Sequence, residues 1–269
     1  MLRNKKEREL REYAIAPENI LEVRDLHVRI KVDDYELHAV RGVDFTMKKG
    51  ETLGLVGESG CGKSVTSKEV LGINPDNCSA QGQILYRTKS GRVLNLLELD
   101  RDGAAYRAIR GAEIAMIFQE PMTALNPLFT IGYQLEEVLC LHLGMTKKQA
   151  RKRGVELLER VRIPRAERIM DEYPHQLSGG MRQRVMIAMA IACRPKVLIA
   201  DEPTTALDVT IQAQVLELMK ELVADLDMAI IFITHDLGVI AEMASDVLVM
   251  YAGRVAVSYT HLTLPTNSL

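Results

Sequence analysis

One segment constrains the fold of this chain more than any other: a glycine-rich loop between a short apolar strand and a helix. The loop runs from Gly57 to Ser64, reads GESGCGKS and fits the pattern G-x-x-x-x-G-K-[ST]. A strand pattern at residues 52–56 precedes it, and a helix pattern at residues 63–71 follows it. Glycines let successive backbone N–H groups face one point, and the helix N-terminus adds partial positive charge there. The segment therefore predicts a phosphate-binding loop rather than an ordinary glycine-rich turn.

This loop predicts a nucleotide and Mg²⁺ as ligands. We expect Lys63 to reach the β- and γ-phosphates and the Ser64 hydroxyl to bind Mg²⁺. The residues expected to contact nucleotide here are Gly57, Glu58, Ser59, Gly60, Cys61, Gly62, Lys63, Ser64 and Val65. The motif indicates nucleotide binding without indicating what the nucleotide is used for.

A second candidate half of the site is an apolar strand that ends in two carboxylates. Residues 197–200 read VLIA and lead into Asp201 and Glu202. A buried strand would deliver Asp201 to the metal shell, and Glu202 could act as general base on the attacking water. Taken alone, two acids at this place are as consistent with a simple cap on the end of the strand as with a catalytic pair.

Further segments make the catalytic interpretation stronger. Residues 177–183 read LSGGMRQ and open a helix, while Gln119, Asp208 and His235 each follow a predicted strand or the acid pair. In this order the segments resemble the ABC ATPase set of Walker A, Q-loop, signature, Walker B, D-loop and H-loop, over roughly residues 20–256. The LSGG sequence is the most diagnostic, because ordinary P-loop NTPases lack it.

The resemblance implies a mechanism in which two such domains stack head to tail around two ATP molecules. Lys63 and Ser64 of one domain would face Ser178, Gly179 and Gly180 of the other. A helix N-terminus with a serine hydroxyl and bare glycine amides is a second anion site, so ATP would join the two subunits.

The same resemblance gives roles to four more side chains. Gln119 would bind Mg²⁺, sense the γ-phosphate and link to a transmembrane partner, and His235 would hold the γ-phosphate and the water. Asp208 would carry contacts across the dimer. Tyr35 lies near the place where the family stacks adenine on an aromatic ring, although a partly buried strand tyrosine fits almost as well.

The order of predicted elements indicates an α/β fold. Short apolar strands alternate with helices, which predicts a mostly parallel sheet covered on both faces. We expect a P-loop NTPase (ABC ATPase) core over residues 18–256, with an antiparallel β subdomain that includes residues 83–86 and 93–97. Strand signals vanish at about residues 120–180, which predicts an inserted α-helical subdomain.

Both ends of the chain differ from this pattern. Residues 1–17 form a charged lead-in. The stretch VSYTHLTLPT, residues 257–266, resembles the translation of a transposase mosaic-end adapter used in sequencing libraries. We expect residues 257–269 to be non-native on this ground, the alternative being an irregular polar tail.

Composition limits the class of partner and the cellular compartment that we expect. The net charge is −2, which gives no sign of nucleic-acid binding. The four cysteines are scattered without metal-ligand spacing, which favours a reduced, cytosolic protein. No secretory signal is visible and no apolar run approaches the ~20 residues of a membrane helix, so other chains would span any membrane.

Two longer segments narrow the resemblance. Residues 116–127 (MIFQEPMTALNP) and 173–184 (YPHQLSGGMRQR) are similar to the dipeptide/oligopeptide/nickel importer group. That group implies a second, paralogous ABC ATPase subunit, two integral-membrane permeases and, indirectly, an extracytoplasmic solute-binding protein. It also implies a peripheral position on the cytoplasmic face of the bacterial inner membrane, with the helical subdomain docked on a permease helix. Because the motor subunit does not contact the solute, peptides, nickel, glutathione-like compounds and sugars all stay open, as does a homodimer or heterodimer.

Two other classes compete with this interpretation. One is a soluble ABC ATPase of DNA repair, chromosome maintenance or translation control, and the other is a noncatalytic P-loop binding module. The first class typically carries long coiled coils, zinc modules or tandem ATPase domains, of which the sequence has no sign. Retention of Glu202 and His235 argues against the second.

Overall fold

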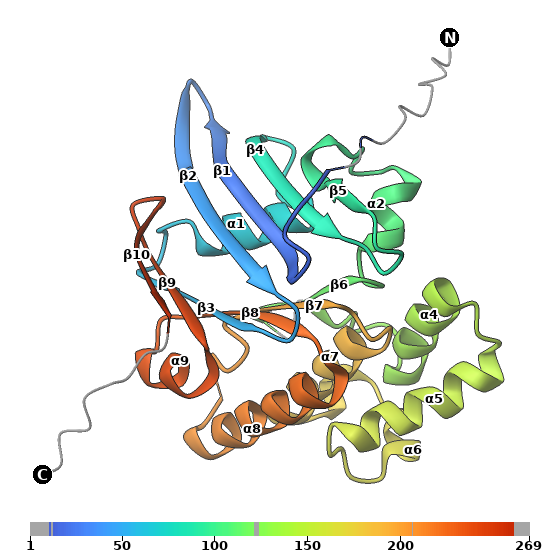
Figure 1. The fold of residues 1–269 in the computed structure, drawn as a ribbon. Helices are drawn as coiled ribbons and strands as arrows, with labels where there is room; N and C mark the ends of the chain where they lie inside the picture. The colour runs from blue at the N-terminus through green and yellow to red at the C-terminus, as the bar shows by residue number, and fades with distance from the viewer. Residues whose placement is uncertain (1–10, 12, 121–123, 206, 261–269) are drawn as a thin grey trace, which may run out of the picture.

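The central layer of the protein is a six-stranded sheet with the order β10-β9-β3-β8-β7-β6 (Figure 1). The computed structural model describes residues 11, 13–120, 124–205 and 207–260. Neighbouring strands are parallel from β9 to β6, and β10 runs antiparallel to β9. The strands are β3 (Thr52–Gly57), β6 (Ile114–Ile117), β7 (Val197–Asp201), β8 (Ala229–Thr234), β9 (Asp246–Tyr251) and β10 (Arg254–Thr260).

The parallel strands are apolar along their whole length because both faces of the sheet are covered. Successive side chains of β7 and β8 point to opposite faces: Leu198 and Phe232 pack in one core, whereas Ile199 and Ile231 pack in the other. The first core contains the helices below the sheet, and the second contains the antiparallel β subdomain above it (Figure 1).

That β subdomain is a four-stranded antiparallel sheet with the order β2-β1-β4-β5. Its strands are β1 (Asn19–Val32), β2 (Tyr35–Lys48), β4 (Cys78–Arg87) and β5 (Val93–Asn95). Residues preceding β1 are bound to β4, since Arg87 at the end of β4 donates to the carbonyls of Ile15 and Ala16 at 3.1 and 3.0 Å.

The helices fall into a core set and an inserted set (Figure 1). The core set is α1 (Lys63–Val70), α2 (Ala104–Ile109), α7 (Gly179–Ile191), α8 (Val209–Leu226) and α9 (Leu237–Met243), with the 3-10 turn η1 (Leu96–Glu98). The inserted set is α4 (Ile131–Leu143), α5 (Lys147–Arg160) and α6 (Ala166–Ile169), with the 3-10 turn η2 (Pro174–Gln176).

Local sequence explains why the inserted helices begin and end where they do. The Thr130 hydroxyl accepts from the N–H of Tyr133 at the start of α4, and Gly144 ends α4 in the left-handed conformation at φ 62°. Thr146 and Gln149 form a reciprocal capping box at the start of α5. α5 contacts both α4 and α6, and α4 and α5 contact α7, so the insert packs as one unit on the core.

The predicted α/β P-loop architecture is confirmed, including the antiparallel and helical parts. The pattern did not predict α2, α6 or β10. β10 includes Val257 to Thr260, which pair with β9 although they belong to the stretch expected to be non-native. The rest of that stretch, residues 261–269, and most of the lead-in, residues 1–10 and 12, lie outside the described residues.

The structure also describes the state of the cysteines and the lengths of the helices. All four cysteines are free thiols. Over the same residues, no helix combines the length and apolarity that a membrane crossing requires.

Candidate nucleotide site

Four adjacent parallel strands end along one edge of the central sheet, and each delivers a candidate site residue there. In spatial order, β3 leads to the glycine-rich loop, β8 to His235, β7 to Asp201 and Glu202, and β6 to Gln119. Ligands of open α/β sheets bind outside these carboxyl ends. The sheet therefore brings together residues that are up to 178 positions apart, since Gly57 ends β3 and His235 follows the adjacent strand β8.

The glycine-rich loop is wrapped around the amine of Lys63. This amine donates to the carbonyls of Gly57 at 2.7 Å and Glu58 at 2.9 Å, and the residue is 6% exposed. Gly62, the N-cap of α1, has a φ of 106°, and a Cβ there would lie 2.7 Å from the carbonyl oxygen of Ala39. Only glycine fits this position, which holds the cationic amine at the start of α1.

The loop and the acid strand meet through one hydrogen bond. The Ser64 hydroxyl donates to Asp201 Oδ1 at 3.1 Å. Asp201 is 3% exposed, and its burial raises the pKa of the carboxyl, an effect that the Ser64 hydrogen bond and Lys68 partly offset. The Ser64 hydroxyl and the buried Asp201 carboxyl thus place two oxygen atoms close together, and a bound cation would stabilise the ionised carboxylate.

Glu202 follows immediately and has an unusual backbone. Its φ is 47°, in the left-handed region, and its N–H donates to the Ile233 carbonyl at 2.9 Å. Its carboxylate accepts from Gln119 Nε2 at 3.1 Å and from the Thr205 hydroxyl at 2.9 Å, and His235 Nδ1 lies 3.4 Å away. Three predicted residues are therefore brought together, and Thr205 joins them without having been predicted.

The signature segment and the D-loop segment meet at the starts of two helices. The Ser178 hydroxyl accepts from the N–H of Met181 and begins α7, while the Asp208 carboxylate accepts from the N–H of Ile211 and begins α8. A Cβ on Gly180 would lie 2.8 Å from Ile211 Cγ2, whereas Gly179 has open space around it. Neighbouring Ala206 is outside the described residues, as are residues 121–123 of the Q-loop segment.

These glycines do not complete the phosphate loop of the same chain. In the described ranges, no hydrogen bond joins residues 178–180 to residues 57–65. Ser178 and Gly179 are exposed, so this helix start is free to meet another molecule.

Tyr35 lies at the tip of the β1–β2 hairpin and is 63% exposed. The part of β2 beside the phosphate loop is Ala39, whose carbonyl approaches Gly62. Four residue steps of extended chain, about 13 Å, lead from Tyr35 to Ala39. Tyr35 is therefore remote from the phosphate end of the site, and its contact with adenine stays a prediction.

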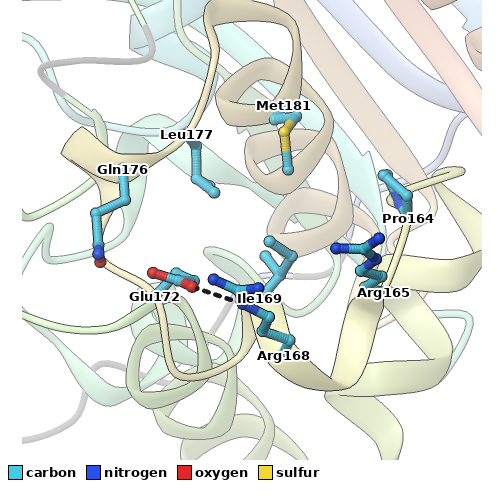
Figure 2. A pocket seen from close by; sticks show the side chains of 8 residues that line it. All are labelled: Pro164, Arg165, Arg168, Ile169, Glu172, Gln176, Leu177 and Met181. Carbon is cyan, nitrogen blue, oxygen red and sulfur yellow. Dashed lines mark hydrogen bonds and ion pairs between the residues drawn. The ribbon is translucent and has the colours of Figure 1, made fainter.

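A hollow of about 560 Å³ adjoins the signature segment (Figure 2). Its apolar part includes Ile169 and Leu177, both buried. Arg168 pairs with Glu172 at 3.1 Å along its rim. The full lining is Pro164, Arg165, Arg168, Ile169, Glu172, Gln176, Leu177 and Met181. Leu177 and Met181 belong to the signature segment, but the motif does not predict the hollow, because its lining comes together only when α6, η2 and α7 pack.

An exposed apolar group lies at the start of the helical subdomain. Leu128, Phe129 and Tyr133 are 78%, 41% and 50% exposed, and the last two rings stack with centroids 4.6 Å apart. Adjacent exposed aromatic residues typically mark a protein contact.

Comparison with known proteins places these features in a family. The model of the family described as ABC transporter matches residues 40–205. The chain is 54% identical to the oligopeptide transport ATP-binding protein AppD of Bacillus subtilis over 90% of this chain and 72% of the relative. It is 52% identical to the glutathione import ATP-binding protein GsiA of Pectobacterium atrosepticum over 87% of this chain, but spans only 38% of that relative.

The fold has a matching solved structure. The ATP-binding cassette MJ0796, in a dimeric post-hydrolysis state bound to ADP and Pi, superimposes with a TM-score of 0.77 and 27% identity. The match covers 91% of this chain and 100% of that one.

Proposed function

The chain belongs to the ABC transporter family of ATP-binding proteins, and on this premise we propose that it binds and hydrolyses ATP to drive an importer. The observation that carries the proposal is the convergence of Lys63, the Ser64–Asp201 contact and the Glu202 cluster at one sheet edge. Lys63 neutralises the β- and γ-phosphates, Glu202 takes the proton of the attacking water, and His235 holds the γ-phosphate and that water.

Mg²⁺ fits the same edge. Ser64 Oγ and Asp201 Oδ1 lie 3.1 Å apart and are hard oxygen donors. No cluster of three or more acidic, histidine or cysteine side chains suited to a metal occurs within the described ranges, which agrees with a cation bound by few protein ligands and by substrate phosphates. We assign Ser64, Asp201 and Gln119 to this ion, which supplies charge neutralisation on the phosphates.

The second half of each site comes from another subunit. The exposed start of α7, with Ser178, Gly179 and Gly180, offers a hydroxyl and helix N–H groups for a phosphate held by a second ATPase subunit. Asp208 lies beside it at the start of α8 and would contact the partner. The dimeric state of the MJ0796 cassette supports this arrangement.

The coupling to a membrane runs through the helical subdomain. Gln119 contacts Glu202, and the chain leads from Gln119 into the subdomain that exposes Leu128, Phe129 and Tyr133. We assign this apolar group to one of two permease subunits, which places the chain peripherally at the cytoplasmic face of the bacterial inner membrane. An extracytoplasmic binding protein would act on the same permeases from the other side.

The solute class is a short peptide or a related small molecule. The names of the similar ATP-binding proteins, which include oligopeptide and glutathione transport, support this assignment. Uptake of labelled di- and tripeptides by membranes that contain the chain and its permeases tests it, and failure of peptides to enter would overturn it.

The substitution Glu202→Gln tests the hydrolysis mechanism. It preserves size but removes the base, so we expect ATP binding to persist, hydrolysis to fall by at least about 100-fold and an ATP-bound dimer to accumulate with the partner subunit present. Glu242→Gln is the matched control, because Glu242 is exposed, lies outside the site and pairs with Lys220. Hydrolysis that continues undiminished in Glu202→Gln would rule out Glu202 as base.

A further inference from the structure

The turn after β7 holds the carboxylate of Glu202 through a side chain that the reaction above does not use. The Thr205 hydroxyl donates to Glu202 Oε2 at 2.9 Å, and the Thr205 N–H donates to the Glu202 carbonyl at 3.2 Å. Thr205 therefore contacts both the backbone and the side chain of the residue three positions before it. The two residues belong to one tight turn, so this contact is local to the segment that follows β7.

The two oxygens of the Glu202 carboxylate have different surroundings. Oε2 accepts from Thr205 and also from Gln119 Nε2 at 3.1 Å. Among the described residues, Oε1 has only His235 Nδ1, at the long distance of 3.4 Å. A carboxylate oxygen offers about two acceptor sites, so Oε2 is saturated and Oε1 keeps capacity for another donor.

We propose that Thr205 is a positioning residue: its hydroxyl fixes the Glu202 carboxylate so that Oε1 is presented to the attacking water. This inference rests on the proposed role of Glu202 as base. In the reaction, Oε1 accepts one proton from water as the water oxygen bonds to the γ-phosphorus, and the bond from that phosphorus to the leaving ADP oxygen breaks.

Thr205 differs in kind from Gln119, the other donor to Oε2. Gln119 lies 83 positions away at the end of β6, and its chain leads directly into the helical subdomain. Its contact therefore depends on how that subdomain sits, whereas the Thr205 contact is local. Glu202 also has a φ of 47°, a conformation that costs free energy in a non-glycine residue and persists only where neighbouring contacts support it.

Thr205→Val and Thr205→Ser test the proposal in membranes that contain the chain assembled with its partner ATPase subunit and permeases. Valine keeps the shape but removes the donor, whereas serine keeps the donor. A general base contributes about 10²–10⁴-fold, so an unfixed base should lower kcat about tenfold in Thr205→Val. The KM for ATP should stay within about twofold, because the base does not bind the ground-state nucleotide. Thr205→Ser should restore kcat to within about twofold of the unsubstituted protein.

Thr46→Val is the control for exchanging an exposed threonine, because Thr46 lies on β2 in the other sheet. An unchanged kcat in Thr205→Val would overturn the proposal. So would an equal loss in Thr205→Ser, or a loss confined to KM.

Glu202→Gln, measured in parallel, distinguishes failure of the positioning role of Thr205 from failure of the proposed role of Glu202 as base. If Glu202→Gln still hydrolyses ATP, the assignment of the base and the role of Thr205 both fail. If Glu202→Gln is inactive while Thr205→Val is normal, only the role of Thr205 fails.

Discussion

The two signature glycines have opposite surroundings, and this predicts opposite effects on stability when each is replaced by alanine. Both belong to the first turn of α7, where alanine should gain up to about 0.5–1 kcal/mol over glycine. A Cβ on Gly179 meets no atom within 4 Å, so Gly179→Ala should keep this gain. A Cβ on Gly180 would lie 2.8 Å from Ile211 Cγ2, which forces a packed isoleucine to shift.

The size of the difference follows from these contacts. Overpacking of this kind typically costs about 1–3 kcal/mol, which outweighs the gain in helix propensity. We expect Gly180→Ala to be less stable than Gly179→Ala by about 2 kcal/mol, or roughly 4–8 °C in the midpoint of unfolding for a chain of this size.

Thermal and urea unfolding of both variants, followed by circular dichroism, measure the difference. The same substitution made in an Ile211→Ala background provides the internal control, because alanine lacks the Cγ2 atom. There Gly180→Ala should no longer destabilise. Equal midpoints for Gly179→Ala and Gly180→Ala, or a penalty that survives in the Ile211→Ala background, would refute the steric reasoning.

Two further predictions concern regions away from the site. Burial, together with a hydrogen bond and repulsion from Asp246, raises the pKa of Glu51 from 4.5 to about 7. The folded state therefore binds this proton more tightly than the unfolded state, and its contribution to stability is complete below about pH 4.5 and is lost as pH rises through 7. Glu51→Gln should thus become more stable relative to the unsubstituted chain as denaturation is measured from pH 5 to pH 8; parallel profiles would contradict this. Thr146→Ala removes the side-chain cap and half of the capping box of α5, and should lower the free energy of unfolding by about 1 kcal/mol; an unchanged urea midpoint would show that the cap contributes nothing.

The sequence predicted those parts of the site that local chemistry specifies. The loop around Lys63 needs glycines at set positions, and these can be recognised from consecutive residues. The same is true of an apolar strand that ends in Asp201 and Glu202. The long helices α4 and α5 were predictable for the same reason, because their caps and apolar periodicity are local.

What the sequence did not predict depends on tertiary neighbours. Thr205 reads as one of two adjacent threonines in a turn, and only the left-handed backbone of Glu202 turns the carboxylate toward its hydroxyl. The hollow beside the signature segment and the short helices α2 and α6 depend on packing between elements, for which residue spacing carries no signal. The exposed position of Tyr35 was not predicted either, because sequence periodicity does not fix how far the β1–β2 hairpin extends; its contact with adenine stays a prediction.

The strand order sets the distance between the phosphate loop and the two acids. β8 separates β3 from β7, so two interstrand spacings, about 10 Å, lie between the strand that carries the phosphate loop and the strand that carries the acids. Adjacent strands would leave roughly half that distance, and here the Ser64 side chain bridges the gap by reaching Asp201. The intervening strand thus acts as a spacer, and because His235 follows it, the spacer carries a side chain to the middle of the gap that it creates.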